Sequence, residues 1–184
     1  LGTGGLDGWI GCSMTAQTFD GYRSLGGQQF YGGRDYLVGG GDLFAWVSST
    51  SRWWIEYRQQ EAMFGEPDRL VIMVCSKGGR APTNAAMEAV LQVAEAEAPG
   101  AEIVVMGQPG YVEGHLCGLI APTLDQQEVV LVAQQAVVSH AVALGATPGP
   151  VLPLLGPTTT RDACHANAAG LILLGQAMID WTGA

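Results

Sequence analysis

Basic side chains are scarce in this sequence of 184 residues. Eight Lys and Arg stand against 17 Asp and Glu, so the formal net charge at pH 7 is -9. A chain of this sign is repelled by phosphate backbones and by anionic lipid surfaces. We therefore expect no nucleic-acid partner.

Long apolar runs are also missing. The richest stretch, EVVLVAQQAVVSHAVAL, contains Gln134, Gln135, Ser139 and His140, whereas a membrane helix needs about 18 or more consecutive apolar residues. We expect a soluble chain with no membrane span. The sequence opens on LGTGG, without an initiator Met, a basic region or an apolar signal core. This start is typical of a trimmed or mature form, so secretion with the signal peptide removed is one option for its location.

The four cysteines show no CxxC spacing, which leaves little support for a zinc ribbon or a thioredoxin-type site. We predict neither a metal nor a cofactor. Cys117 and Cys164 fall in loops expected at the same end of the fold. A disulfide between them and buried free thiols are two open alternatives. Cys12 is expected to pack inside.

Apolar residues make up 48% of the chain, enough for one sizeable core, and we expect a single domain over residues 1–184. Helical patterns occupy 52–64, 83–98, 125–144 and 168–181. Strand-like runs occupy 8–11, 35–38, 69–74, 101–106 and 150–155. This alternation predicts an α/β fold: a three-layer, flavodoxin-like sandwich with a five-stranded parallel sheet flanked by helices.

Ligands of such sheets bind at the carboxyl ends of the strands, so we expect the functional residues there. Ser13 follows the first predicted strand in a turn, and Asp162 and His165 follow the last. An unactivated serine is a poor nucleophile and needs a neutral histidine to take its proton, with a carboxylate to orient the imidazole. Backbone N–H groups at Ser13 and in the VGGGD turn could bind the oxyanion.

These motifs resemble the SGNH (GDSL-like) hydrolase family, which has a Gly-Asp-Ser motif after the first strand and Asp-x-x-His before the last helix. The resemblance covers nearly the whole chain, and its most specific part is DACHAN followed by AAGLILLGQAM. It implies that Ser13, His165 and Asp162 are catalytic. It also implies that Gly41, after the second strand, donates its N–H to the oxyanion together with Ser13.

The chain departs from the family pattern in two places. Its first motif reads Gly11-Cys12-Ser13, with Cys in place of the acidic residue. The Gly-x-Asn-Asp motif expected after the third strand is replaced by Cys75-Ser76-Lys77-Gly78. Because the Asn of that motif completes the oxyanion hole, one donor is unassigned. The side chains that could replace it are Asn84, Lys77, Arg80 and Gln108, although Asn84 is also expected as a helix N-cap, and Lys77 and Arg80 as solvated loop charges.

Other residues have competing interpretations. His115 is a candidate substrate-binding residue, as are Gln108 and Lys77, and it is a distant second candidate for the base. His140 lies within an apolar helix and is expected to be structural. The aromatic residues of the 52–64 helix could form a carbohydrate platform, but their helical spacing favours half-buried core positions: Trp53, Trp54 and Tyr57.

We therefore predict a serine esterase that hydrolyses carboxylic esters through an acyl-enzyme. The resemblance implies small esters, O-acetyl groups on sugars or lipids as substrates. A histidine base predicts activity that rises as an imidazole loses its proton, at about pH 6 to 7 for an unshifted group. The alternative is a catalytically impaired binding module on the same fold, for a glycan or another partner. The α/β-hydrolase fold shares the Ser, Asp, His order, but its nucleophile lies in GxSxG, whereas Ser13 lies in GxSxT.

Overall fold

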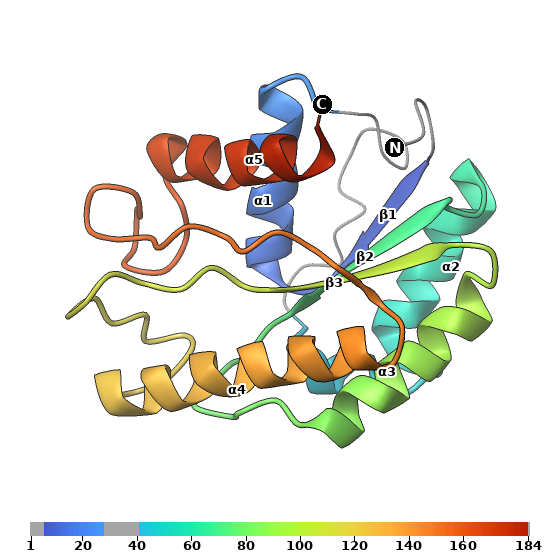
Figure 1. The fold of residues 1–184 in the computed structure, drawn as a ribbon, viewed down its shortest axis with the longest axis horizontal. Coiled ribbons are helices and arrows are strands. Elements are labelled where there is room, and N and C mark those ends of the chain that lie inside the picture. Colours follow the sequence, from blue (N-terminus) through green and yellow to red (C-terminus); the bar gives the residue numbers. More distant parts are fainter. Residues whose placement is uncertain (1–5, 28–40, 184) are drawn as a thin grey trace.

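The computed structural model describes residues 6–27 and 41–183 of the chain (Figure 1). Their elements are, in order, β1 (Asp7–Ile10), α1 (Ser13–Ser24), the 3-10 helix η2 (Leu43–Trp46), α2 (Arg52–Phe64), β2 (Arg69–Val74), α3 (Asn84–Glu97), β3 (Glu102–Gly107), α4 (Leu124–Ala143), β4 (Thr147–Pro148) and α5 (Ala168–Thr182).

The strands form one parallel sheet in the order β1-β2-β3-β4. β1 is buried along its whole length, and in β2 only the first residue is partly exposed. Strands that are covered on both faces need continuous apolar sequence, which is why the runs WI and LVIMV lie here. The predicted parallel α/β sheet is confirmed.

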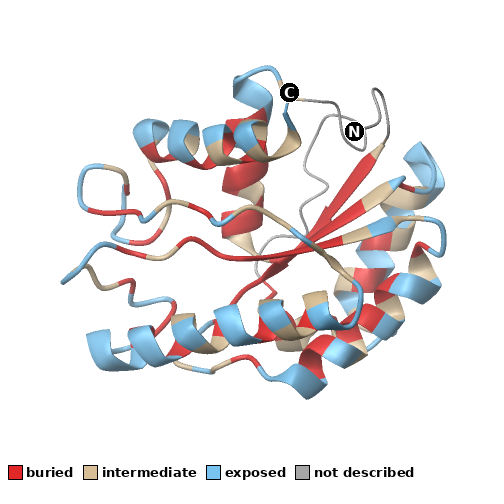
Figure 2. Cartoon of the chain, viewed as in Figure 1, coloured by how far each residue is buried: buried red, intermediate tan, exposed pale blue. Residues whose placement is uncertain are grey.

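Helices cover both faces of this sheet. α1 and α5 lie on one side, and α2, α3 and α4 lie on the other (Figure 1). Buried residues concentrate on the strands and on the helix faces turned toward them (Figure 2). The arrangement is the predicted three-layer sandwich.

The number of strands differs from the predicted five. The described residues form four strands, and the predicted strand at 35–38 lies outside them. The prediction of a strand over 150–155 is wrong, because the last strand is β4, which is only two residues long. Pro150 and Pro153 have no N–H to donate to a neighbouring strand, so this apolar run cannot continue the ladder.

The four predicted helices are confirmed to within two residues at either end. A side chain accepts a backbone N–H at the start of each one: Ser51, Thr83, Thr123 and Asn167. α1 was not predicted, since the segment after Ser13 was expected to be a turn. Three of the residues that α1 buries are polar, Thr15, Gln17 and Thr18, and they interrupt its apolar pattern.

α1 and α5 pack with their backbones in contact. A Cβ on Gly21 would lie 2.0 Å from the carbonyl oxygen of Leu171, and a Cβ on Gly175 would lie 2.2 Å from the carbonyl carbon of Gly21. Only glycine fits at both positions. This crossing fixes the helix that begins with Ser13 against the helix that follows His165.

The aromatic residues of α2 belong mostly to the core. Trp54 and Tyr57 are fully buried, with ring centroids 5.2 Å apart, and Trp53 is partly buried. Their core interpretation is confirmed. Of the helices within 6–27 and 41–183, none is long and apolar enough to cross a membrane.

Candidate active site

Ser13 is the first residue of α1 and follows the short turn after β1. Gly11, between them, has φ +150°, and a Cβ on it would lie 2.2 Å from Thr15 Oγ1. That hydroxyl accepts a hydrogen bond from Cys12 N at 2.9 Å, which closes the first turn. The N–H groups at the start of a helix have no intrahelical partner and form the positive end of its dipole. Ser13, the first residue of α1, therefore combines a side-chain hydroxyl with a favourable place for negative charge.

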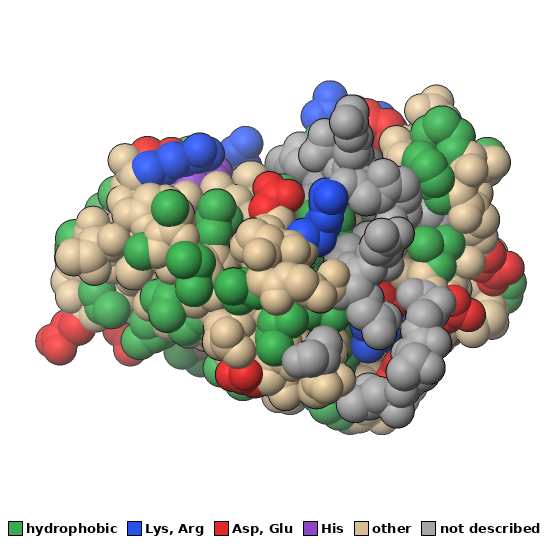
Figure 3. Space-filling view, turned by 90° about the horizontal axis from the view of Figure 1, so that it is seen from above, with side chains coloured by type: hydrophobic (Ala, Val, Ile, Leu, Met, Phe, Trp, Pro, Cys, Tyr) green, Lys and Arg blue, Asp and Glu red, His purple; other side chains and the backbone are tan. Residues whose placement is uncertain are grey.

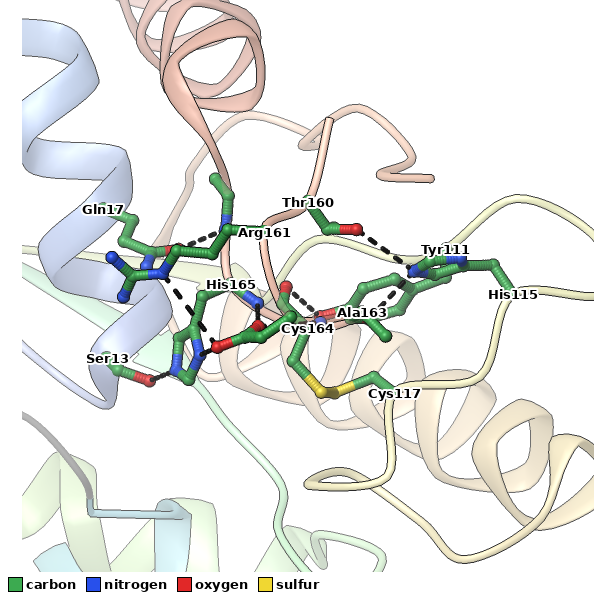
Figure 4. Close-up of polar contacts among 12 residues, drawn as sticks. Ser13, Gln17, Tyr111, His115, Cys117, Thr160, Arg161, Ala163, Cys164 and His165 are labelled. Carbon is green, nitrogen blue, oxygen red and sulfur yellow. Dashed lines mark hydrogen bonds and ion pairs between the residues drawn. A yellow bond between two sulfur atoms is a disulfide. The ribbon is translucent and has the colours of Figure 1, made fainter. Parts of the chain in front are cut away.

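Ser13, His165 and Asp162 form a continuous hydrogen-bonded chain (Figure 4). His165 Nε2 lies 3.0 Å from Ser13 Oγ, and His165 Nδ1 lies 2.8 Å from Asp162 Oδ2. With its proton on Nδ1, the imidazole donates to the carboxylate and leaves Nε2 to accept from the serine hydroxyl. The structure thus brings together a serine hydroxyl, an imidazole and a carboxylate from the two ends of the chain.

Asp162 is held in its charged form. Hydrogen bonds from the His165 backbone and imidazole, and from the Cys164 backbone, lower the pKa of this carboxyl to about 2. Arg161 Nε lies 4.0 Å from the carboxylate. Asp162 is therefore ionised at neutral pH and fixes the orientation of the imidazole.

Two side chains tie the loop containing His165 to the rest of the fold. Gln17, one turn after Ser13 on α1, accepts a hydrogen bond from Ala166 N at 2.8 Å. The Tyr111 hydroxyl donates to the carbonyl oxygen of Cys164 at 3.0 Å. Burial, together with the charge of Asp162, raises the pKa of Tyr111, so this hydroxyl stays protonated as a donor. The sequence carried no signal that pointed to either contact.

His115 lies against the same loop rather than beside Ser13. Its Nε2 lies 2.8 Å from the carbonyl oxygen of Ala163, and its ring stacks on Tyr111 with centroids 5.5 Å apart. Ala163 has φ 62°, a left-handed backbone conformation. The hydrogen bond between His115 Nε2 and the Ala163 carbonyl oxygen supports this turn. That turn brings the Asp162 carboxylate within hydrogen-bond distance of the His165 imidazole. His140 pairs with Glu88 at 2.7 Å and so links α4 to α3.

Two disulfides lie close to the site, and no cysteine is free. Cys117 is bonded to Cys164, and Cys12 is bonded to Cys75. The second pairing was not expected, because Cys12 was expected only to pack inside. A usable signal existed: Cys12 and Cys75 each come just after one of two adjacent parallel strands. Among the described residues, no cluster of three or more His, Cys, Asp or Glu side chains could hold a metal ion.

A pocket of about 120 Å³ lies beside Ser13 and His165. Its other lining residues come from the start of α1, from the segments after β2 and β3 and from nearby loops: Cys12, Met14, Asp42, Cys75, Ser76, Lys77, Gln108, Tyr111, Cys117, Leu119, Ile120 and Cys164. The side chain of His165 is 19% exposed and that of Asp162 is 49% exposed. These exposed fractions show that the site opens to solvent. Figure 3 shows a histidine surface beside basic side chains at one end of the molecule.

Two solved structures are similar to this chain over nearly its whole length. One is a putative SGNH hydrolase from Slackia heliotrinireducens, with a TM-score of 0.61 and 19% identity, covering 96% of this chain and 98% of that one. The other is a putative GDSL-like lipase from Parabacteroides merdae, with a TM-score of 0.53 and 14% identity, covering 97% and 95%. The chain has an SGNH-hydrolase fold. No protein-family model and no curated protein matches the sequence.

Within this SGNH-hydrolase fold, two of the four candidate replacement donors lie at the pocket. Lys77 is exposed at its edge and Gln108 is buried in its wall. Asn84 is exposed in the first turn of α3 and does not line the pocket; the expected N-cap is Thr83 instead. The guanidinium of Arg80 stacks over the Phe44 ring at 3.3 Å.

The side-chain amide of Gln108 has a hydrogen-bond donor that no described residue uses. It is 4% exposed, and its Oε1 accepts a hydrogen bond from Ser76 N at 3.0 Å. Because a backbone N–H requires an acceptor, the oxygen of the amide must face Ser76. The amide nitrogen of Gln108 then has no hydrogen-bond partner in the described part of the chain.

Gly41 lies next to this pocket through its neighbour Asp42, which lines it. Leu43 N donates to the carbonyl oxygen of Cys75 at 3.0 Å, so the segment is attached to the end of β2. A Cβ on Gly41 would lie 2.9 Å from Trp46 Nε1. The tight packing leaves no room for a side chain at this position.

Proposed function

We propose that this protein is a serine esterase that hydrolyses carboxylic esters. Ser13 is the nucleophile, His165 is the general base, and Asp162 orients the imidazole. The observation that carries the proposal is the unbroken hydrogen-bonded chain from Ser13 Oγ through His165 to Asp162. The fold shared with an SGNH hydrolase and a GDSL-like lipase supports the same chemistry.

The reaction proceeds in two halves. Ser13 Oγ attacks the ester carbonyl carbon while its proton moves to His165 Nε2, giving a tetrahedral oxyanion. Collapse of this intermediate breaks the bond to the alcohol oxygen, which takes the proton from His165, and leaves an acyl-enzyme. Water then attacks the acyl group with His165 as base again, and the acid is released.

Backbone N–H groups supply two donors for the oxyanion. The N–H of Ser13 lies in the first turn of α1, where it has no intrahelical partner and where the helix dipole favours negative charge. The second donor is the N–H of Gly41, which precedes the pocket residue Asp42. This assignment follows the family resemblance and agrees with the close packing around Gly41.

Gln108 supplies the third donor in our proposal. A buried donor without a partner costs about 1 to 3 kcal/mol, so its presence requires a reason. An oxyanion that forms during the reaction would give the Gln108 amide nitrogen the partner that it lacks in the free protein. Gln108 would then replace the Asn of the missing Gly-x-Asn-Asp motif. Lys77, at the pocket edge, contacts the substrate.

A binding module on the same fold is the competing function, motivated by the altered motifs. Such a module needs no proton acceptor beside a serine hydroxyl. The 3.0 Å contact between Ser13 and His165, and the lowered pKa of Asp162, favour the enzyme.

Two disulfides also support an extracytoplasmic location. Disulfides persist in oxidising compartments and are rare in reducing ones. All four cysteines of this chain are paired, which favours secretion among the locations that the sequence leaves open.

Replacing Ser13 tests the proposal. Ser13→Ala should reduce the turnover of p-nitrophenyl acetate by at least about a thousandfold, since it removes the nucleophile. Ser24→Ala, at the other end of α1 and exposed to solvent, is the matched control and should retain activity. Full turnover by Ser13→Ala would refute the assignment.

A further inference from the structure

A second and larger hollow lies next to the pocket of Ser13. Its volume is about 680 Å³, within the range of sites that hold drug-sized ligands. α4 forms one wall, and the chain after β3 and the segment 149–154 form the others. We call it the α4 groove; its lining residues are Met106, Gly107, Gln108, Gly110, Tyr111, Val112, Glu113, Gly114, Leu124, Asp125, Gln127, Glu128, Leu131, Val132, Gln135, Val138, Gly149, Pro150, Val151, Leu152 and Leu154.

The groove exists because the chain leaves the sheet after β4. Beyond the sheet, the segment that follows β3 and the segment that leads to the His165 loop run side by side above α4 (Figure 1). Leu155 N donates to the carbonyl oxygen of Gly110 at 2.9 Å, and Val112 N donates to that of Leu155 at 2.8 Å. These bonds hold the two segments together as one wall facing α4.

The α4 groove and the pocket of Ser13 are neighbours that share part of their walls. Gln108 and Tyr111 line both. The pocket, at about 120 Å³, has room for little more than the reacting ester group, whereas the groove is several times larger. A substrate with its carbonyl at Ser13 can therefore place the rest of one chain only a short distance away, in the groove.

The walls of the groove are apolar although they face solvent. Five large hydrophobic residues are exposed along it: Val112, Leu124, Val132, Val151 and Leu154. Val151 is 85% exposed and Val132 is 64% exposed, on opposite walls. Exposed apolar side chains gathered around one hollow mark a place where an apolar ligand is buried.

The charges at the groove are of one sign. Glu113, Asp125 and Glu128 line it, and no Lys or Arg is found among its described lining residues. Carboxylates disfavour an anionic ligand such as a phospholipid headgroup, and apolar walls offer few partners to the hydroxyls of a sugar. The fitting ligand is neutral and apolar.

We infer that the α4 groove binds the apolar chain of a neutral, lipid-type ester whose carbonyl lies at Ser13. The inference rests on the proposed esterase function and selects one substrate class for it, in preference to acetylated sugars. Gln108 and Tyr111 then lie at the junction between the reacting carbonyl and the bound chain.

A chain-length series gives the first test. Burial of a methylene group is worth up to about fourfold in kcat/KM. For p-nitrophenyl esters from acetate to decanoate, kcat/KM should therefore rise at least about a hundredfold in total. A parallel series of alkyl acetates, with the alcohol varied, tells which half of the ester occupies the groove. A preference for the shortest chain in both series, acyl and alcohol, would overturn the inference.

Two valines of α4 provide a matched pair of variants. Val132 lines the groove and Val129 does not, yet both are 64% exposed. Val132→Asp places a carboxylate on the groove wall and should lower the ratio of decanoate to acetate kcat/KM at least about tenfold. Val129→Asp adds the same charge to the same helix and should leave this ratio unchanged. Equal ratios in the two variants would place the chain elsewhere and refute the proposal.

A binding measurement separates this inference from the esterase assignment. 2-Decanone, a neutral ketone that cannot be hydrolysed, should bind to Ser13→Ala in isothermal titration, and more weakly when Val132→Asp is added. Such binding without turnover of any ester by the wild type would refute the esterase function and retain the groove. Ester turnover without ketone binding and without chain-length preference would refute the role of the α4 groove and retain the esterase function.

Discussion

Cys12 and Cys75 form a disulfide that joins the residue before Ser13 to the residue directly after β2. These are the two places where the sequence departs from the SGNH pattern that it resembles. Cys12 stands where the family has an acidic residue, and Cys75 begins the segment that lacks Gly-x-Asn-Asp. A single covalent bond therefore connects both departures and holds the turn of Ser13 beside the end of β2.

Removing this bond should destabilise the protein. The two cysteines are 63 residues apart in sequence, so the bond restricts a long loop of the unfolded chain. The double variant Cys12→Ala/Cys75→Ala should lose about 2 to 4 kcal/mol in the free energy of unfolding, measured by urea denaturation. An unchanged urea midpoint would show that the bond contributes nothing to the stability of the fold.

Gln17 should act as a positioning residue for His165. It accepts the N–H of Ala166, the residue next to the imidazole. Gln17→Met removes that acceptor, and a small displacement of the base should lower kcat about tenfold or more, with little change in KM. Gln17→Glu keeps an acceptor oxygen and should restore most of the rate. If both variants lose stability and rate together, Gln17 serves only the packing of α1.

Gln108 should affect the transition state more than substrate binding. Gln108→Glu retains an acceptor for Ser76 N but loses the amide donor, and Gln108→Met loses both. Removing one oxyanion donor lowers kcat by about 10²- to 10³-fold. We expect losses of this size in kcat in both variants, with little change in KM. Wild-type kcat in Gln108→Glu would rule out the donor role.

Asp162 should make stability depend on acidity. Its pKa in the folded protein is about 2, against an ordinary value of 3.8, because backbone and imidazole N–H groups of His165 favour the charged form. The unfolded chain thus binds more protons between these values. The contribution of Asp162 to the free energy of unfolding is complete above about pH 4 and is lost as the pH falls toward 2. Urea unfolding of Asp162→Asn at several pH values should show a shallower acid decline than the wild type, and parallel curves would contradict the assigned cause.

Much of the fold could be predicted because its elements have strong local patterns. The apolar runs at β2 and β3, and the capped helices α2 to α5, each agree with their burial. α1 could not be predicted from hydrophobicity, since the residues it buries include Thr15, Gln17 and Thr18. The strand predicted over 150–155 was wrong because this run has the composition of a strand, while its prolines prevent pairing with a neighbouring strand.

Part of the candidate site could also be predicted from local sequence. Asp162 and His165 are three residues apart and follow the expected sheet edge, so their partnership is local. The contacts of Gln17 and Tyr111 with the loop of His165 join distant segments through single side chains, which no spacing in the sequence reveals. The α4 groove depends on where the chain leaves the sheet, a tertiary feature without a motif.

The most direct measurement of the central claim is labelling with a fluorophosphonate, followed by peptide mapping. A fluorophosphonate reacts with a serine only when a neighbouring base activates it. We expect one label, on Ser13, that disappears in Ser13→Ala and forms far more slowly in His165→Ala. A label on another residue, or an unlabelled protein that still hydrolyses esters, would contradict it.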